Sequence, residues 1–416
     1  MNEATRHPGG ADNRVVPMSS ARQESLRAHN LTVISRMLFA SSSPMSRADL
    51  AELTGMTRST VSRLVDDLLA GGVLQEGMAA SGGSRGRPAT PLSPAAGSFF
   101  GLGLEVNVDF LAARVVDLTG QVYAERLVPG NYRGADPTQT LGRVGDLGRE
   151  VVQGLPPMSR LAGTVLAMPG LIRSSDQRLL LAPNLEWRDL PTVSALGDLA
   201  PFGRSVTAVN EAKAAALASV AAPEGIDHNG TFIYVSGGIG IGAALVVGGQ
   251  VDAGSHGWGG EIGHVTIEPR GPLCGCGAHG CLEQYAGKVA LSAGEEGLST
   301  GELIESACAE PGPQGQRVRN AVDRAGWALG VGLAAAINVT DIHHVILGGT
   351  FADLAPRLLP VIERELDERV LSSEWSQIVV HGASTGISPA ATGGALRALH
   401  TVISDPASWM SGAKEM

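Results

Sequence analysis

The sequence predicts an α/β protein with an N-terminal winged helix-turn-helix and a larger body made of a duplicated α/β unit. Two observations support this. Residues 46–70 contain two short helical patterns joined by a glycine turn. Strand meanders followed by helices then occur twice, over residues 99–220 and 231–400. A duplicated unit leaves a cleft between its halves, and such clefts commonly bind small ligands.

The composition fits a protein with large cores. The chain has 416 residues, of which 44% are hydrophobic and 17% charged, and a prior of ~150 residues per domain gives roughly three units. No apolar run reaches the ~18 residues of a membrane span, and the polar N-terminus lacks the apolar core of a secretion signal. We therefore expect a cytoplasmic protein. The expected segments are a disordered lead-in (1–20), a winged helix-turn-helix (21–95) and two subdomains (96–225 and 226–416), with the last helix a candidate to pack back on the first subdomain.

The charge is unevenly distributed along the chain. Residues 1–95 contain ten arginines, no lysine and eight acidic residues, so this segment carries +2. The whole chain carries −10, and the remainder therefore carries −12. An acidic body argues against nonspecific nucleic-acid binding by the whole molecule, which leaves the N-terminal segment as the plausible DNA-contacting part.

Three helices are expected in the N-terminal segment. The first covers residues 22–40, whose apolar stripe is Leu26, Val33, Ile34, Met37 and Leu38. Ser46 can cap the second, over residues 47–53, and Thr57 can cap the third, which ends before Gly71. The inner face of the third helix is expected to be Val61, Leu64, Val65, Leu68 and Leu69.

The third helix is the expected reading helix, because the N-terminal residues of such a helix meet base edges in the major groove. After Gly72, alternating residues predict a β-hairpin wing whose tip, Ser81–Pro88, carries arginines suited to phosphates or a minor groove. The candidate DNA contacts are Thr57, Arg58, Ser59, Thr60, Ser62, Arg63, Arg85 and Arg87. The alternative is a small helical protein-interaction domain. DNA binding is favoured because the turn, the helix caps, the reading residues and the basic wing occur in the order expected of a winged helix-turn-helix.

Three of the four cysteines fall within the stretch CGCGAHGCLEQY. Cys274, Cys276 and Cys281, with His264 ten residues upstream, supply three thiolates and one imidazole, the ligand set of a structural zinc site. Intervening Gly275, Gly277 and Gly280 allow tight turns between them. A redox pair and ordinary buried cysteines are the alternatives, but a reducing compartment disfavours a disulfide. Cys308 is expected to be a core residue.

These residues resemble the ROK family, which joins sugar-responsive repressors, open reading frames and sugar kinases. The most specific match is Glu261-Ile262-Gly263-His264 followed by the cysteine cluster and Glu283, which reproduces the family's zinc signature. Supporting matches are Met168-Pro169-Gly170, Ala182-Pro183-Asn184-Leu185-x-Trp187, Asn210-Glu211-Ala212, Ile346-Leu347-Gly348-Gly349 and the wing motif Gly86-Arg87-Pro88. The helix-turn-helix is similar to that of the repressor branch, which includes the xylose and N-acetylglucosamine repressors.

The resemblance implies an actin-like, ribonuclease-H-like pair of subdomains with a sugar site between them. By motif position the sugar ligands would be Gly170, Asn210, Glu211, Glu261, His264 and Glu283. His264 would then serve both zinc and sugar through its two ring nitrogens. The expected partners are operator DNA and a sugar effector, together with further copies of the chain as a homodimer or homotetramer, because helix-turn-helix proteins usually read paired half-sites.

Three positions depart from the kinases of the family. Their first phosphate loop is Asp-x-Gly-Gly-Thr, whereas this chain has Gly103–Asn107, in which the two loop glycines are missing and Glu105 is expected to repel phosphates. The second loop, Gly-Thr-Gly in the kinases, reads Ser236-Gly237-Gly238, so the hydroxyl of its central threonine is lost. The catalytic Asp is replaced by Glu211, and a displacement of ~1 Å can cost ~100-fold in rate.

The sequence therefore predicts a sugar-responsive transcriptional repressor of carbohydrate genes with a zinc-stabilised, catalytically inactive body. The alternative is an ATP-dependent sugar kinase carrying a DNA-binding arm. A third hypothesis is an interaction protein with a vestigial pocket, whose DNA binding would ignore every sugar.

Overall fold

The computed structural model describes residues 18–41, 43–77, 90–221, 230–292, 302, 305, 312–384 and 386–410. It contains two compact units, Met1–Pro94 with Val402–Met416 and Ala95–Thr401. The predicted wing tip with Arg85 and Arg87, Cys308, and the expected subdomain boundary at residue 225 lie outside the described residues. Among the described residues, no helix combines the length and apolar character needed to cross a bilayer.

The N-terminal unit contains a helix-turn-helix. Its elements are α1 (Met18–Ala40), α2 (Arg47–Thr54), α3 (Arg58–Ala70), β1 (Leu74–Glu76), β2 (Leu92–Pro94) and α13 (Pro406–Met410). It also holds the last residues of α12 (Pro389–Ser404). Strands β1 and β2 pair antiparallel, which is the pairing expected at the base of a wing. Because α1 begins at Met18, the last residues of the expected lead-in 1–20 are helical.

The caps of the helix-turn-helix form where the sequence predicts them. The Ser46 side chain accepts from the backbone N–H of Asp49, whose carboxylate accepts from the N–H of Ser46, so α2 has a full capping box. Gly55 ends α2 in the left-handed region with φ 68°, which glycine adopts without strain. Thr57 Oγ1 caps α3 by accepting from the N–H of Thr60.

The expected stripe of α1 needs one correction. Leu26 is 60% exposed, whereas Leu31, which is absent from the predicted stripe, is fully buried with Ile34 and Leu38. A period of 3.6 residues places Leu31, Ile34 and Leu38 on one face and turns Leu26 away from it. On α3 the residues Val61, Leu64, Val65 and Leu68 are buried, and Leu69 is half-buried.

The body has two five-stranded sheets. The first has the order β10-β6-β3-β4-β5. Its strands are β3 (Phe99–Val106), β4 (Phe110–Asp117), β5 (Val122–Pro129), β6 (Arg160–Met168) and β10 (Val206–Asn210). A small sheet, with the helical turns η1 (Ser194–Leu196) and η2 (Ala200–Phe202), joins β6 to β10. Its strands are β7 (Leu171–Arg173), β8 (Arg178–Ala182) and β9 (Trp187–Pro191). The sequence pattern does not predict this sheet.

The second sheet has the order β13-β12-β11-β14-β15. Its strands are β11 (Phe232–Gly237), β12 (Ile241–Val247), β13 (Gln250–Asp252), β14 (His344–Gly349) and β15 (Val379–Gly382). The helical segments of this half are η3 (Ile262–His264), α6 (Glu283–Ala286), α7 (Lys288–Leu291), α9 (Pro313–Thr340), α10 (Thr350–Asp353) and α11 (Ala355–Arg369). In both sheets the central strand has an antiparallel neighbour on one side and a parallel neighbour on the other.

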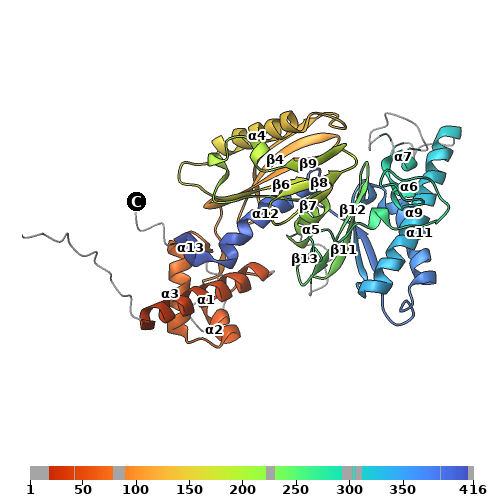
Figure 1. Ribbon diagram of the computed structural model, residues 1–416. Helices are drawn as coiled ribbons and strands as arrows, with labels where there is room; N and C mark the ends of the chain where they lie inside the picture. The colour runs from red at the N-terminus through yellow and green to blue at the C-terminus, as the bar shows by residue number, and fades with distance from the viewer. Residues whose placement is uncertain are drawn as a thin grey trace, which may run out of the picture. The chain divides into compact units, whose positions relative to one another are not determined.

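Alternation along the central strands creates three layers in each half. Phe100, Leu102 and Leu104 of β3 pack against α4 (Pro137–Gln153), whereas Gly101 and Gly103 face α12. In the second sheet, Ile233 and Val235 of β11 face α9 and α11. The opposite face of β11 packs against α5 (Glu211–Ala221), which contacts strands of both sheets and is visible between them in Figure 1. The start of α5 is therefore well placed for a site between the halves.

Candidate functional site

Four expected metal ligands converge in the structure. His264, at the end of η3, and Cys274, Cys276 and Cys281 bring their ligand atoms within 4.8 Å of one another. His264 Nδ1 lies 3.8 Å from Cys274 Sγ, and Cys276 Sγ lies 3.7 Å from Cys281 Sγ. A tetrahedral ion with metal–sulfur bonds of ~2.3 Å has edges of ~3.8 Å, so these spacings fit a cation of that geometry.

The backbone of this loop depends on two of its three glycines. Gly277 has φ 94° and Gly280 has φ 67°, both in the left-handed region. A Cβ at Gly280 would also overlap the carbonyl oxygen of Glu268. Gly275, by contrast, faces open space and has no left-handed φ, so its role is weaker than the sequence suggested. The loop is held closed by backbone bonds such as Cys274 N–H to Ala278 O (2.8 Å).

Burial and neighbouring thiols raise the pKa of the Cys281 thiol to about 12. Thiolates are the metal-binding form, and a bound cation provides the charge that this buried cluster otherwise lacks. Cys274 and Cys281 are buried, His264 is half-buried and Cys276 is exposed. The four side chains therefore form a group that could hold a metal ion.

The six expected sugar ligands lie on segments that meet near the start of α5. Asn210 Oδ1 accepts from the N–H groups of Ala212 and Lys213, which caps α5, and Asn210 Nδ2 donates to Gly170 O (3.1 Å). Glu283 Oε2 accepts from Ile241 N–H (3.3 Å), and its other oxygen lies 4.0 Å from Cys274 Sγ. Glu283 thus joins the metal loop to the turn before β12.

Glu211, the first residue of α5, lies among other carboxylates. Burial and then the charges of Glu105 and Glu261 raise the pKa of Glu211 to about 8, while a hydrogen bond from Asn107 Nδ2 (3.4 Å) opposes this. Burial also raises the pKa of Glu261, against the lowering effects of His264 and Lys213. A carboxyl group that holds its proton at neutral pH can both donate to and accept from a polyol hydroxyl.

Glu105 has a different position from the one expected. It is 3% exposed, and its Oε2 accepts from the Ser388 hydroxyl (2.6 Å) and the Ala391 N–H (3.0 Å) at the start of α12. The expectation that Glu105 repels a phosphate in an open loop therefore needs correction, because its carboxyl group is enclosed by α12. Burial nevertheless raises the pKa of Glu105, as the two hydrogen bonds only partly offset desolvation.

Sequence reasoning missed two polar residues near this site. Lys213 is 7% exposed, and its ammonium donates to Gly257 O, on the loop between β13 and η3. Its signal was a single lysine within the alanine-rich helix α5. Asn184 belongs to the Ala182–Trp187 motif, which by itself predicts no role for it; its amide and the Glu283 carboxylate occupy the space where Gly240 lacks a side chain.

The candidate DNA contacts at α3 are grouped at its first turns. Thr57, Arg58, Ser59 and Arg63 are exposed, and Thr60 and Ser62 are half-buried. Asp66 and Asp67, farther along α3, pair with Arg47 and Arg27. Within the part of the chain that the structure describes, no ion pair involves Arg58 or Arg63, so both guanidinium groups are available to an anionic partner.

Known protein families match both the body and the helix-turn-helix region of this chain. The ROK family model matches residues 102–400, and the model of the crp family of bacterial regulatory proteins matches residues 44–74. The chain belongs to the ROK family. A xylose repressor of Bacillus subtilis (strain 168) is 30% identical over 357 residues, which cover 84% of this chain and 90% of the relative.

Two solved structures show the same fold as this ROK protein. A ROK family transcriptional regulator, described as a homologue of the E. coli MLC protein, aligns with a TM-score of 0.71 at 21% identity and covers 93% of this chain and 99% of its own. A ROK glucokinase from Streptomyces griseus, in complex with glucose and AMPPNP, aligns with a TM-score of 0.61 at 23% identity and covers 72% and 99%. The body is thus an actin-like, kinase-type body preceded by a helix-turn-helix region.

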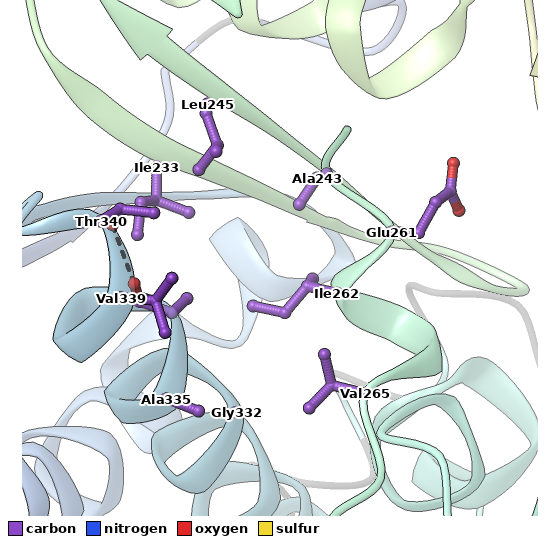
Figure 2. Close-up of a pocket in the computed structure, with 12 residues that line it drawn as sticks. Ile233, Ala243, Leu245, Glu261, Ile262, Val265, Gly332, Ala335, Val339 and Thr340 are labelled. Atoms are coloured by element: carbon purple, nitrogen blue, oxygen red, sulfur yellow. Dashed lines mark hydrogen bonds between the residues drawn. The ribbon is translucent and has the colours of Figure 1, made fainter. Parts of the chain in front are cut away.

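A separate cavity lies on the other side of the Glu261 segment. It has a volume of about 350 Å³ and is lined by apolar or small residues of β11, β12, η3 and α9, with Thr340 and Glu261 at its edge. Figure 2 shows the Glu261 carboxylate pointing away from the other lining side chains. The Thr340 hydroxyl is already bonded to Ala336 O (2.8 Å). This apolar cavity is therefore distinct from the polar groups expected to bind sugar.

Proposed function

We propose that this ROK protein is a sugar-responsive, DNA-binding transcriptional repressor whose kinase-type body is catalytically inactive. The observation that carries the proposal is the capped helix-turn-helix, with the exposed Arg58 and Arg63 on α3, in the same chain as a ROK body. The likeness to the xylose repressor extends over 84% of the chain, whereas the glucokinase covers 72% of it.

The DNA contacts would be Thr57, Arg58, Ser59, Thr60, Ser62 and Arg63 on α3, with Arg85 and Arg87 from the wing. Arginine suits guanine edges and phosphates, and serine and threonine accept either role. Because such proteins commonly read paired half-sites, the operator-bound form would be a homodimer or a homotetramer.

The effector would be a sugar held by Gly170, Asn210, Glu211, Glu261, His264 and Glu283. The metal would be Zn2+ bound by His264, Cys274, Cys276 and Cys281, because thiolate-rich tetrahedral sites suit zinc. In this arrangement His264 Nδ1 faces the thiols, which leaves Nε2 for the sugar. The similar strand orders of the two sheets support an internally duplicated body with the sugar between its halves.

Loss of phosphoryl transfer is supported by both former phosphate loops. In the first, Asn107 Nδ2 donates to Glu211 instead of leaving a glycine backbone open to phosphate, and Glu105 is enclosed by α12. In the second, a Cβ at Gly237 would overlap the Phe351 ring, so this part of the loop is covered by an aromatic side chain. The backbone N–H of Asn107 donates to Phe110 O and that of Gly238 to Gly240 O, both at 2.9 Å, so these two N–H groups are already bonded, unlike those that cradle phosphates in kinases.

The first test is a thermal-shift screen of the zinc-loaded protein against pentoses, hexoses, amino sugars and their phosphates. A ligand at a hundredfold excess over its Kd stabilises the folded state by ~2.7 kcal/mol, which such a screen detects. Genomic fragments retained by the sugar-free protein would then supply an operator for binding assays. The proposal fails if every sugar leaves both melting and operator binding unchanged, or if Mg-ATP and a hexose give steady turnover.

Operator binding is tested with Arg58→Ala, and Arg126→Ala on the body serves as a matched control with an exposed arginine. We expect Arg58→Ala to weaken operator binding by ~10-fold or more without changing the sugar Kd, since one base contact contributes ~1–3 kcal/mol. If both variants bind the operator with equal affinity, α3 is not the reading helix.

A further inference from the structure

One buried carboxyl group holds the start of α12. Glu105 Oε2 accepts from the Ser388 hydroxyl (2.6 Å) and from the Ala391 N–H (3.0 Å). The first N–H groups of a helix have no intrahelical partner, and a carboxylate there also interacts favourably with the helix dipole. Arg114 holds the same turn from β4, since its Nη1 donates to Thr392 Oγ1 (2.6 Å) and to Ser388 O (3.3 Å).

The first half of α12 packs backbone to backbone on two other elements. A Cβ at Gly103 of β3 would overlap the Ala391 carbonyl, and a Cβ at Gly393 of α12 would overlap the Ala214 carbonyl of α5. In both contacts the glycine allows the two backbones to approach without an intervening side chain. Because packed interiors transmit displacements, β3, α5 and the start of α12 are expected to move together.

These same two elements reach Glu211, one of the expected sugar ligands. Asn107 directly follows β3, and Glu211 begins α5. Asn107 Nδ2 donates to Glu211 Oε2 (3.4 Å), and the charge of Glu105 contributes to the raised pKa of Glu211. A ligand that binds Glu211 therefore changes the surroundings of Glu105, which holds α12.

The other end of α12 belongs to the N-terminal unit. Val402 is fully buried, and Ser404 O accepts from Thr32 Oγ1 of α1 (3.0 Å). Trp409 of α13 is 7% exposed. A Cβ at Gly71, which follows α3, would overlap the side chain of Met410, so the end of the described chain lies against the end of the expected reading helix.

We propose that α12 and α13 couple the sugar site to α3, with Glu105 as the positioning residue that holds the start of this connection. The inference rests on the proposed function and concerns the regulation of its site. Helix α12 is uninterrupted from Pro389 to Ser404, a length of about 24 Å at ~1.5 Å per residue. A sugar that displaces Glu211 shifts the start of α12, and the shift reaches Gly71 through α13.

The experiment uses the full chain, D-xylose and D-glucose as probes, and an operator fragment selected from genomic DNA. The variants are Glu105→Ala, Glu105→Gln, Ser388→Ala and Trp409→Ala, with Glu363→Gln on the exposed face of α11 as control. Three quantities are measured: the sugar Kd, the operator Kd without sugar, and the factor by which saturating sugar changes the operator Kd.

We expect a coupling factor of ~10 or more in the parent protein, within the usual range of ~5–150. Glu105→Ala, Ser388→Ala and Trp409→Ala should reduce it to about 3 or less while the sugar Kd stays within ~3-fold. Glu105→Gln should retain most of the coupling factor, because an amide oxygen can accept the same two hydrogen bonds. A full coupling factor in both Glu105→Ala and Ser388→Ala overturns the inference but leaves the proposed function intact.

Hydrogen exchange tests the connection without any sugar. The amides of Gly71, Gly72 and Val73 are bonded to Asp67, Leu69 and Leu68 at the end of α3. Glu105→Ala should accelerate their exchange by ~5-fold or more, and Glu105→Gln and Glu363→Gln should not, since opening of α12 lowers local stability beyond it. Unchanged exchange in Glu105→Ala contradicts the connection, even if neither probe sugar binds.

Discussion

Two regions of the molecule each bring several acidic groups close together. The metal loop is Cys274–Glu283, and the carboxylate cluster consists of Glu105, Glu211 and Glu261. In each region, ionisation of all the groups at once would cost free energy through mutual repulsion. In the loop, burial and crowding raise the pKa of Cys281 to about 12. In the cluster, burial and crowding raise the pKa of Glu211 to about 8. The two regions relieve the same electrostatic difficulty by different means.

The metal loop is suited to relief by a cation, and the carboxylate cluster is suited to relief by protons and hydrogen bonds. Thiolates around one point form strong bonds to a divalent ion, which stabilises all of them at once. The carboxyl groups instead have an amide, Asn107, and the N-terminus of α12 as partners. We therefore expect the stability contributed by the metal loop to depend on metal, and that contributed by the carboxylate cluster to depend on pH.

The largest expected effect is loss of the metal loop. We expect Cys281→Ser to abolish stoichiometric zinc and to lower the free energy of unfolding by ~5 kcal/mol, because metal binding contributes directly to folding. Metal content by elemental analysis and unfolding by calorimetry measure this. Sugar-induced stabilisation should disappear as well, since Glu283 lies on this loop and His264 is one of the four expected metal ligands. Unchanged melting of a zinc-free variant would contradict a folding role.

A second change breaks the loop without touching a ligand. Gly280→Ala should cost ~3 kcal/mol, because φ is 67° and the new Cβ overlaps the Glu268 carbonyl. Gly275→Ala is the matched control, since that position faces open space and lacks a left-handed φ. Denaturant unfolding of both variants gives the comparison. Equal losses would show that loop geometry is not what distinguishes these glycines.

The pH response of the cluster follows from the pKa of Glu211. Since its folded value is about 8 and its usual value is 4.5, the folded state binds more protons between these limits. Stability should therefore fall as pH rises from about 5 to 8.5, with a contribution of a few kcal/mol from Glu211, since one pKa unit corresponds to ~1.4 kcal/mol. We expect Glu211→Gln to flatten this slope and Glu363→Gln to leave it unchanged in unfolding measurements at several pH values. If the stability of Glu211→Gln falls with pH as steeply as that of the parent protein, a group other than Glu211 is titrating.

The smallest effect should come from Asn107→Ala. Its amide donates to Glu211, which lowers the pKa of that carboxyl group, so its removal should raise the pKa. We expect the pH midpoint of the Glu211 contribution to move upward by less than about one unit, because the 3.4 Å bond is long. The same unfolding series on Asn107→Ala measures the midpoint, and a downward movement would contradict the assigned contact.

Short-range features were predictable from the sequence alone. The helix-turn-helix follows from Ser46, Gly55 and Thr57, each of which acts on backbone within three residues of itself. The metal cluster follows from three cysteines within eight positions and one histidine at the end of a nearby turn. Both depend on local backbone geometry, which residue type and spacing largely determine.

The tertiary structure decided what distant residues do to one another. Glu105 lies 283 positions from Ser388, and Lys213 lies 44 from Gly257, so no local pattern pairs them. The same is true of α12, whose start packs on β3 and α5 while its end lies in the N-terminal unit. The physical reason is that burial and long-range contact, which set the pKa of Glu211 and the partner of Glu105, exist only once the sheets and helices have packed.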